Sequence, residues 1–334
     1  FAGPIGAVRV GRVEGEFVAN PTHAQMESSD LDLVYVGNEK NMIMFEGSAD
    51  ELPEADFLAA LKFGQESIAP VIAAQKELRE AVGKPKREFT PRVVEAEVQA
   101  EAESIIGGRI TDALLIQAKL EREAACNALK DEMEEKLVEK FGEEDITGFI
   151  VGEAFYSIQK AAVRRLVLDD GKRLDGRGSE DLRALSSEAG MIPRTHGSGL
   201  FSRGETQGLS LVTLGTTDDT QTFDAYTGGP NEKRFMLHYN FPNFSVGETG
   251  RIMGPGRREI GHGALAERSI APVIPSLEDF PYAVRVTSEI MESNGSTSMA
   301  AVCSGTLALL DAGVPLKRPV AGISIGLCTR SNDA

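Results

Sequence analysis

The sequence predicts an α+β protein that holds parts of two mixed domains with an all-helical segment between them. Short β-prone runs separated by Gly, Asn and Asp fill the first 46 residues, and similar runs return from residue 171. The stretch between them has a helical composition. The run GPIGAVRVG at 3–11 is echoed by RPVAGISIG at 318–326. This echo indicates either two copies of one domain or a chance similarity between β-rich segments.

Length and composition are those of a globular protein with two or three domains. The chain has 334 residues, of which 41% are hydrophobic and 26% are charged. Because no run of about 18 apolar residues occurs, we expect no membrane span and no membrane partner. The net charge of −16 argues against a basic nucleic-acid-binding coat, although an acidic shell can still contain a local cationic site.

The cysteines are Cys126, Cys303 and Cys328. They lie far apart in the sequence and form no CxxC pair, which favours a reducing compartment over a disulfide framework. We therefore expect a cytoplasmic protein.

The first 86 residues are expected to form a sheet with a covering helix. Residues 5–46 contain the β-prone runs IGAVRVGRV, EFVANPT, LDLVYVG and NMIMFEG. Residues 54–83 carry apolar side chains at helical spacing and end at Gly83, just before Pro85. Strands followed by a covering helix predict a compact α+β unit.

Residues 87–170 are expected to be all-helical. This stretch is rich in Ala, Glu, Lys and Leu and has few strand signals. We predict three or four helices, with breaks at Gly107-Gly108 and near Gly142. The acidic run at 132–136 is interpreted as a solvated helix face rather than a binding tail.

Mixed strand and helix signals return from residue 171. GLSLVTLGTTDD (208–219) and FMLHYNFPNFSVGE (235–248) alternate as strands do. SMAAVCSGTLALLDAG (298–313) predicts a buried helix that ends at a glycine. PVAGISIG (319–326) predicts the strand that follows.

A small polar loop runs directly into the predicted buried helix. It contains Ser296, Thr297 and Ser298. The exposed N–H groups and the positive dipole end of a helix favour a phosphate group, and adjacent hydroxyls add hydrogen-bond donors. Plain N-capping is the alternative, but capping needs one hydroxyl rather than three.

The segment GPGRREIGHG (254–263) is predicted to be a glycine-rich loop that carries positive charge. Arg257 and Arg258 can each fork onto phosphate oxygens. His262 can donate to an anion or hold an arginine in place. The alternative is a turn whose Arg258 and Glu259 form surface ion pairs.

The segment RTHGSGLFSRGETQ (194–207), which includes Arg203, has a similar polar and glycine-rich composition. A simple β-hairpin is the alternative interpretation of this segment. Other chemistries lack their signatures in the sequence. It contains no Cys/His spacing typical of zinc sites and no GxxxxGK[ST] loop.

Longer segments of the chain resemble a known family, bacterial-type polynucleotide phosphorylase. Over about 150 residues the order and spacing of motifs resemble the second catalytic core of that family. These motifs are KRLDGRGSEDLRAL, PRTHGSGLFSRGETQ, FMLHYNFPNFSVGETGRIMGPGRREIGHGALAER, FPYAVRVTSEIMESNGSTSMAAVCSG and DAGVPLKRPVAGISIGL. GPIGAVRVG, ANPT and SDLDLVYVGNEKNMIMFEG resemble the end of the first core, and the helical stretch resembles the all-α linker domain.

The resemblance implies tandem ribonuclease PH-like cores, both incomplete, joined by the linker domain. It places the C-terminal part of the first core at 1–86, the linker at 87–170 and the N-terminal part of the second core at 171–334. The implied activity is that of a 3′-to-5′ phosphorolytic exoribonuclease, a polyribonucleotide nucleotidyltransferase. Such an enzyme degrades single-stranded RNA with inorganic phosphate to nucleoside diphosphates in mRNA turnover.

The resemblance also implies partners, a cofactor and site residues. We expect a homotrimer, contacts with proteins of an RNA-degradation complex, and Mg²⁺ or Mn²⁺ as the cofactor. The serine and threonine hydroxyls of residues 296–298 are expected to hold the attacking phosphate. Arg257 and Arg258 are expected to contact the scissile region and RNA phosphates, and His262 to orient the phosphate or the terminal nucleotide. Arg203 is expected to lie beside the site and to contact RNA.

The chain also departs from the family pattern. Thr297 stands where many members have serine, which keeps the hydroxyl. The family's motif L-x-D-I-x-G-x-E-D-x-x-G-D-M-D-F-K, whose acidic residues bind the metal, does not occur in these residues, so its ligands are expected beyond Ala334. We therefore expect an internal piece of a longer enzyme that is inactive or nearly so by itself. The alternative is a non-catalytic ribonuclease PH-like ring subunit that binds RNA or partners.

Overall fold

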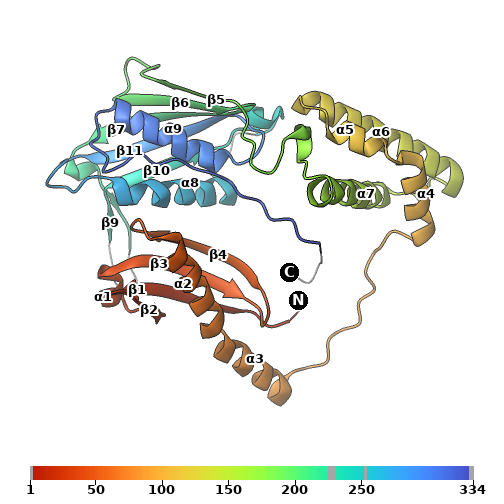
Figure 1. Cartoon of the computed structure of the whole chain (residues 1–334), viewed down its shortest axis with the longest axis horizontal. Coiled ribbons are helices and arrows are strands. Elements are labelled where there is room, and N and C mark those ends of the chain that lie inside the picture. The colour runs from red at the N-terminus through yellow and green to blue at the C-terminus, as the bar shows by residue number, and fades with distance from the viewer. Residues whose placement is uncertain (1–2, 225–230, 252–253, 331–334) are drawn as a thin grey trace. The chain divides into compact units, whose positions relative to one another are not determined.

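The computed structural model describes residues 3–224, 231–251 and 254–330, and it divides the chain into two compact units (Figure 1). The α/β unit combines Phe1–Pro85 with Ala184–Ser324. The helical unit combines Lys86–Arg183 with Ile325–Ala334. Mixed sheet-and-helix packing in one unit and helix-on-helix packing in the other agree with the predicted fold class.

The first sheet of the α/β unit is antiparallel, with its strands in the order β2-β1-β3-β4. Alternate residues of β1 and β3 point into the core, because side chains alternate between the two faces of a strand. Val10 and Leu33 are fully buried there. The strands are β1 (Gly6–Val13), β2 (Glu16–Ala19), β3 (Ser29–Gly37) and β4 (Met42–Ala49). The β-prone runs predicted for 5–46 are therefore confirmed.

The predicted covering helix is divided in two. Helix α2 (Glu54–Ser67) and helix α3 (Ala69–Val82) meet at Ile68. Pro70 explains the break, because proline has no N–H to donate and its ring crowds the carbonyl group one helical turn earlier. Gly83 ends α3 as predicted. The short helix α1 (His23–Glu27), which begins with a capping box, was not predicted from the sequence.

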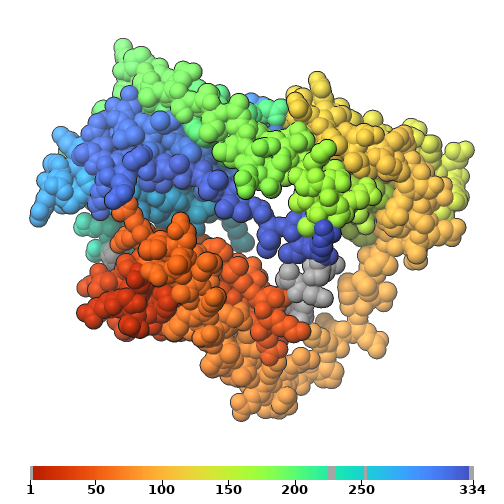
Figure 2. All heavy atoms as spheres, viewed as in Figure 1, coloured from red at the N-terminus to blue at the C-terminus, as the bar shows by residue number. Residues whose placement is uncertain are grey.

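The stretch Glu54–Val82 is long and apolar enough, by length and composition alone, to cross a membrane. Its inner face is nevertheless part of a protein core, because Ile68 and Ile72 cluster with buried residues of β1 and β3. Its outer face lies at the surface, drawn orange in Figure 2. We therefore interpret this stretch as the covering layer of the first sheet.

The helical unit contains α4 (Ala96–Ile106), α5 (Arg109–Leu114), α6 (Lys119–Phe141) and α7 (Gly148–Leu168). The predicted breaks at Gly107-Gly108 and Gly142 are confirmed, and Gly107 and Gly142 adopt positive φ angles of 54° and 94°. Residues 87–95, predicted as part of the helical region, are irregular instead.

Within the acidic run at 132–136 the charged side chains lie at the surface of α6, as predicted, whereas Met133 between them is buried in the core. Glu132 accepts hydrogen bonds from Arg109 at 2.8 Å and from Lys136 at 2.6 Å. These two cations lower the pKa of the Glu132 carboxyl to about 2. Because the network is solvated, we expect it to contribute little to stability.

The second sheet has the strand order β10-β11-β7-β6-β5. Strands β10 and β11 are parallel, and the remaining pairs are antiparallel. The strands are β5 (Leu185–Ala189), β6 (Gly197–Arg203), β7 (Thr206–Gly215), β10 (Phe235–Asn240) and β11 (Ala283–Glu292). A separate short pair is formed by β8 (Gln221–Thr222) and β9 (Glu232–Lys233). One face of the sheet supports the helices that carry the predicted site.

Helix α9 (Thr297–Asp311) lies across one face of this sheet, over β6, β7 and β11 (Figure 1). Most of its side chains are buried, as predicted for 298–313, and the chain turns after it through Gly313 at φ 73°. The helix approaches β6 very closely. A Cβ on Gly197 would lie 2.3 Å from the carbonyl oxygen of Ala308. Glycine in β6 therefore sets the height of α9 above the sheet.

The strand predicted at 319–326 does not form. Its echo in the first sheet, β1, pairs with β2 and β3, which follow it along the chain. No strand of the described residues pairs with 319–326, so its backbone lacks the neighbours that a β ladder requires. Gly322 instead packs on α9, where its N–H donates to Cys303 Sγ at 3.4 Å. Ile323 is 65% exposed.

Candidate anion site at two helix N-termini

Residues 293–296 join the end of β11 to the start of α9. Together with residues 297 and 298, the first two of α9, they form what we call the candidate phosphate loop. Ser296 is the N-cap residue of α9, with φ 47° and ψ 52° in the left-handed region, and Gly295 before it has φ 88°. The Ser296 side chain makes no capping hydrogen bond to the first turn of α9. The N–H groups that begin a helix therefore remain available to an anion at this end.

Strand β6, β7 and the turn between them hold the candidate phosphate loop from one side. Arg203 donates to the carbonyl oxygen of Gly295 at 2.6 Å. The buried Thr206 hydroxyl donates to the same oxygen at 3.2 Å and accepts from the Asn294 N–H at 3.0 Å. Glu205 accepts from the Asn294 side chain at 2.7 Å. These hydrogen bonds fix the path of the loop backbone.

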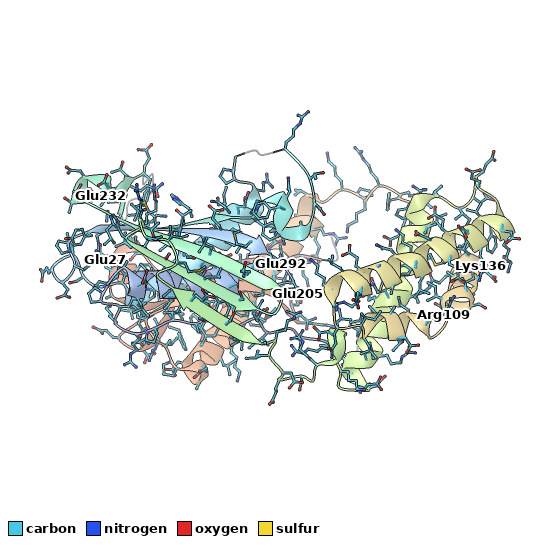
Figure 3. All side chains as sticks on the ribbon, turned by 90° about the horizontal axis from the view of Figure 1, so that it is seen from above. Glu27, Arg109, Lys136, Glu205, Glu232 and Glu292 are labelled. Atoms are coloured by element: carbon cyan, nitrogen blue, oxygen red, sulfur yellow. The ribbon has the colours of Figure 1, made fainter. Side chains whose placement is uncertain are left out.

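Residues 194–207 are therefore both a β-hairpin and part of the site surroundings. The hairpin that the alternative interpretation predicted is present as β6 and β7. Arg203 at its end braces the loop backbone, so its position beside the predicted site agrees with the sequence analysis, while its contact with RNA stays a prediction. Figure 3 labels Glu205 and Glu292, which mark this end of the sheet.

The segment 254–263 is not the glycine-rich loop that the sequence analysis predicted. Helix α8 (Arg257–Ile270) begins inside it, with Gly256 as its N-cap residue. Glu259 accepts from the Gly256 N–H at 2.6 Å and so satisfies one free donor of the first turn. Arg257 and Arg258 are thus the first two residues of a helix and have exposed side chains.

Helix α8 covers the free edge of β10. Glu259 accepts from the Phe241 N–H at 3.1 Å, and Glu267 accepts from the Leu237 N–H at 2.9 Å. These carboxylates replace the backbone carbonyls that another strand would offer. Gly263 lies between them along the helix, where an added Cβ would make an ordinary van der Waals contact of 3.4 Å with the Leu237 carbonyl oxygen. The edge of β10 therefore fixes the position of the arginine pair.

Aromatic side chains at the end of β10 hold the polar residues of α8. The Arg258 guanidinium lies 4.2 Å from the centre of the Phe241 ring, in a cation–π contact. His262 meets the Tyr239 ring edge-to-face, with the ring centres 5.2 Å apart. Tyr239 in turn forms a hydrogen bond with Thr297, with the two hydroxyl oxygens 2.6 Å apart. The N-terminal turns of α8 and α9 are therefore connected through Tyr239.

A cavity of about 550 Å³ opens between β10 and α8. Tyr239, Asn240, Pro255, Glu259 and Lys233 are among the residues that line it. Both polar and apolar side chains face the cavity, and it adjoins the first turn of α8. It therefore offers room for a ligand beside the arginine pair.

The structure thus arranges the predicted site residues in two groups that share one end of the second sheet. Thr297 and Ser298 are nearly buried in the first turn of α9, and Ser296 is partly exposed. The other group, on α8, comprises Arg257, Arg258 and His262. The roles of all these residues in binding and catalysis stay predictions.

Several residues that shape the site were not predicted from the sequence. Thr206, Tyr239 and Phe241 were not singled out, and Glu259 was considered only as a surface ion-pair partner. The spacing Gly256-x-x-Glu259 was a usable signal for a helix start. The aromatic pair Tyr239 and Phe241 had no comparable local signal, because its contacts depend on tertiary structure.

The described ranges 3–224, 231–251 and 254–330 contain no group of three or more His, Cys, Asp or Glu side chains that could hold a metal ion. Beside the loop, the Glu205 carboxylate accepts a hydrogen bond from the Asn294 side chain. These residues therefore do not form the oxygen-rich ligand set that Mg²⁺ needs, and we assign none of them to a metal.

We expect His262 to titrate below the ordinary histidine range. Burial, together with the nearby Arg258 charge, lowers the pKa of this imidazole, and its Nδ1 is buried without a hydrogen-bond partner among the described residues. A lowered folded-state pKa means that His262 supports stability fully above about pH 6.5 and loses that contribution as the pH falls through its folded-state pKa. An NMR titration, assigned with a His262→Gln variant, measures this pKa directly. A midpoint at or above the ordinary value would contradict the packing described here.

We expect Ser296→Gly to stabilise the protein and to weaken phosphate binding. Serine at φ 47° is strained by about 1–2 kcal/mol, and glycine removes that strain, while its own greater freedom in the unfolded state offsets part of the gain. The glycine variant also lacks the hydroxyl that we expect to contact phosphate. Thermal unfolding and a phosphate titration check the two effects. A variant that binds phosphate as the wild type does would remove Ser296 from the site.

Comparisons with known proteins agree with this domain arrangement. Models of the 3′ exoribonuclease family match in two places, domain 2 at residues 3–67 and domain 1 at residues 181–315. The model of the polyribonucleotide nucleotidyltransferase RNA binding domain matches residues 94–178, which include the helical unit's α4 to α7. The chain thus carries domains of a 3′ exoribonuclease on both sides of a family-specific helical domain.

Comparison with curated relatives over the length of the chain identifies the family. The polyribonucleotide nucleotidyltransferase of Opitutus terrae is 53% identical over 98% of this chain and 45% of its own length. That of Akkermansia muciniphila is 54% identical over 100% of this chain and 46% of its own length. The chain therefore belongs to the polyribonucleotide nucleotidyltransferase family, and it spans a little under half the length of these relatives.

A solved structure, rice (Oryza sativa) Rrp46, aligns with a TM-score of 0.33 and 22% identity, over 43% of this chain and 63% of that chain. This similarity is too low to support an argument about the fold or the site.

Proposed function

We propose that the protein is a 3′-to-5′ phosphorolytic exoribonuclease that degrades single-stranded RNA with inorganic phosphate to nucleoside diphosphates. One observation carries the proposal. The uncapped, hydroxyl-bearing start of α9 and the exposed arginine pair at the start of α8 lie at one end of the same sheet, connected through Tyr239. A helix N-terminus suits inorganic phosphate, and two guanidinium groups suit an RNA backbone.

The proposed reaction requires two anions to meet. A phosphate oxygen forms a bond to the phosphorus of the terminal phosphodiester, and the bond from that phosphorus to the 3′ oxygen of the preceding nucleotide breaks. The terminal nucleotide leaves as a nucleoside diphosphate, and the 3′ oxygen takes up a proton. Positioning and charge neutralisation supply most of the catalysis in such a transfer.

Each group of residues has a part in this reaction. The first-turn N–H groups of α9 and the hydroxyls of Ser296 and Ser298 bind the attacking phosphate. Arg257 and Arg258 neutralise the RNA phosphates and hold the terminal phosphodiester in line. His262 is neutral near pH 7, because burial lowers its pKa, so it can donate one hydrogen bond without adding charge.

We further propose Mg²⁺ or Mn²⁺ as the cofactor of the whole enzyme, with acidic ligands that are not among these residues. Such an ion would polarise the phosphate oxygens. No step of the mechanism above depends on it. We accordingly propose that these 334 residues alone bind phosphate and RNA but turn RNA over slowly or not at all.

We also propose how the protein assembles, where it is located and that it acts in mRNA turnover. We propose a homotrimer, contacts with proteins of an RNA-degradation complex and a cytoplasmic location without a membrane partner. The location is supported by the cysteines Cys126, Cys303 and Cys328, which are unpaired thiols.

The test of the proposed function has two steps. Sequencing the gene beyond the codon for Ala334 should reveal a stretch similar to G-D-M-D-F-K. The complete gene product should then release nucleoside diphosphates from single-stranded RNA only when phosphate is added. Release of nucleoside monophosphates, which hydrolysis would give, contradicts phosphorolysis. Loss of the acidic stretch would favour the non-catalytic ring subunit instead.

A further inference from the structure

Tyr239 is a buried polar side chain that the proposed mechanism does not use. It is the fifth residue of β10 and is 3% exposed. Its hydroxyl oxygen lies 2.6 Å from Thr297 Oγ1, a distance typical of a good O–H···O hydrogen bond. Thr297, the first residue of α9, is 2% exposed, so its hydroxyl faces the protein rather than solvent.

This geometry divides the hydroxyls of the candidate phosphate loop into two kinds. The Thr297 hydroxyl is engaged by Tyr239 inside the protein. Among the described residues no group forms a hydrogen bond with the Ser296 or Ser298 side chain; Ser296 is partly exposed and Ser298 is 8% exposed. Thr297 therefore serves as an anchor of the first helical turn, while the serines on either side of it are placed to meet an anion.

The Tyr239 ring also reaches the second group of site residues. Its edge-to-face contact with His262 and its stacking on Phe241, with ring centres 6.4 Å apart and an angle of 15°, tie it to the aromatic surface under Arg258. A shift of Tyr239 would move the support of His262 and the first turn of α9 together. The phenol thus lies between the two helix N-termini at which we place the anions.

We propose that Tyr239 is a positioning residue that acts through Thr297, and that its hydroxyl sets the affinity of the candidate phosphate loop for inorganic phosphate. This inference rests on the proposed function, because it takes the loop to be the phosphate site. The Tyr239–Thr297 hydrogen bond fixes the first turn of α9, so that the N–H groups of that turn and the Ser298 side chain keep the arrangement that an anion requires.

The experiment is a titration of the 334-residue chain with inorganic phosphate, followed by ³¹P NMR. We expect Tyr239→Phe to raise the dissociation constant by up to about tenfold, because the free energy of one hydrogen bond is the most that the ordered first turn can lose. Thr297→Val should raise it by a similar factor, and Thr297→Ser, which keeps the hydroxyl, should bind phosphate as the wild type does. Tyr282→Phe is the matched control, since Tyr282 is 44% exposed in the same unit.

The double variant Tyr239→Phe/Thr297→Val decides whether Tyr239 acts through Thr297. It should bind phosphate no more weakly than Thr297→Val alone, because the second change removes nothing further. Tyr239→Phe alone leaves the buried Thr297 hydroxyl without its partner and could therefore unfold the protein. The double variant replaces both partners of this hydrogen bond by apolar groups of similar shape, so we expect it to stay folded even in that case. A purely structural role would change the unfolding midpoint of these variants and leave phosphate affinity unchanged.

The possible failures are distinguishable. If the wild type does not bind phosphate, or if Ser298→Ala binds it equally well, the loop is not a phosphate site and the proposed function loses its support. If Ser298→Ala weakens binding but Tyr239→Phe does not, the phosphate site stands and the role of Tyr239 is refuted. If the effects of Tyr239→Phe and Thr297→Val multiply in the double variant, Tyr239 does not act through Thr297.

Discussion

Gly199→Val is expected to destabilise the α/β unit by about 2–3 kcal/mol. Gly199 lies in β6 directly under α9. A Cβ at this position would lie 2.6 Å from the Ser304 carbonyl oxygen and 2.7 Å from both the Ala308 nitrogen and Leu307 Cβ. The first two of these atoms belong to the helix backbone, which cannot move aside unless the whole helix shifts. Because α9 carries the candidate phosphate loop, phosphate binding should weaken as well.

Hydrogen exchange of the α9 amides, followed by mass spectrometry, measures this effect within the α/β unit alone. The control is Gly261→Ala in α8, where an added Cβ meets nothing within 4 Å. Because alanine favours a helix more than glycine does, Gly261→Ala should raise the free energy of unfolding by about 0.5–1 kcal/mol. Unchanged protection of α9 in Gly199→Val would show that the close contact with β6 does not support the helix.

The double variant Arg257→Ala/Arg258→Ala is expected to weaken binding of a short single-stranded RNA on the order of 100-fold at low salt. We expect each arginine to form a charge-assisted hydrogen bond with an RNA phosphate. The loss of one such bond typically raises the dissociation constant by a factor of ten or more. The slope of log affinity against log salt concentration should become shallower by about 1.4, because each phosphate contact to a single strand contributes about 0.7. Fluorescence anisotropy over a salt series measures both quantities.

Two variants control for charge and for position. Arg258→Lys keeps the positive charge but loses the fork geometry and the planar contact with Phe241, so it should retain the salt slope and lose part of the affinity. Arg79→Ala removes an exposed arginine from α3 and should leave RNA binding unchanged. A salt slope that stays the same in the double variant would show that the arginine pair does not contact RNA phosphates.

The sequence predicted those features of the fold that depend on local signals. Gly107 and Gly142 ended helices where expected, at positive φ angles that glycine adopts readily, and α3 ended at Gly83 as predicted. The buried helix at 298–313 was likewise evident from its apolar composition. The break at Ile68 was also readable from Pro70, but the continuous apolar spacing across it favoured a single helix.

Features that depend on distant partners could not be predicted. Residues 319–326 have the composition of a strand, yet a strand forms only where a neighbour supplies hydrogen bonds. Helix α8 was hidden by the glycines at 261 and 263, and its position depends on Glu259 and Glu267 reaching the edge of β10. The contacts of Tyr239 join residues 58 positions apart. Such pairings are properties of the folded chain.

The central claim is that the first turn of α9 binds phosphate. The most direct measurement is an X-ray structure of the chain crystallised with tungstate, a phosphate analogue whose anomalous signal locates it without ambiguity. We predict a tungstate within hydrogen-bond distance, about 3 Å, of the Ser298 hydroxyl and the first N–H groups of α9. Tungstate bound only at surface lysines, with the start of α9 empty at saturating concentration, would contradict the account.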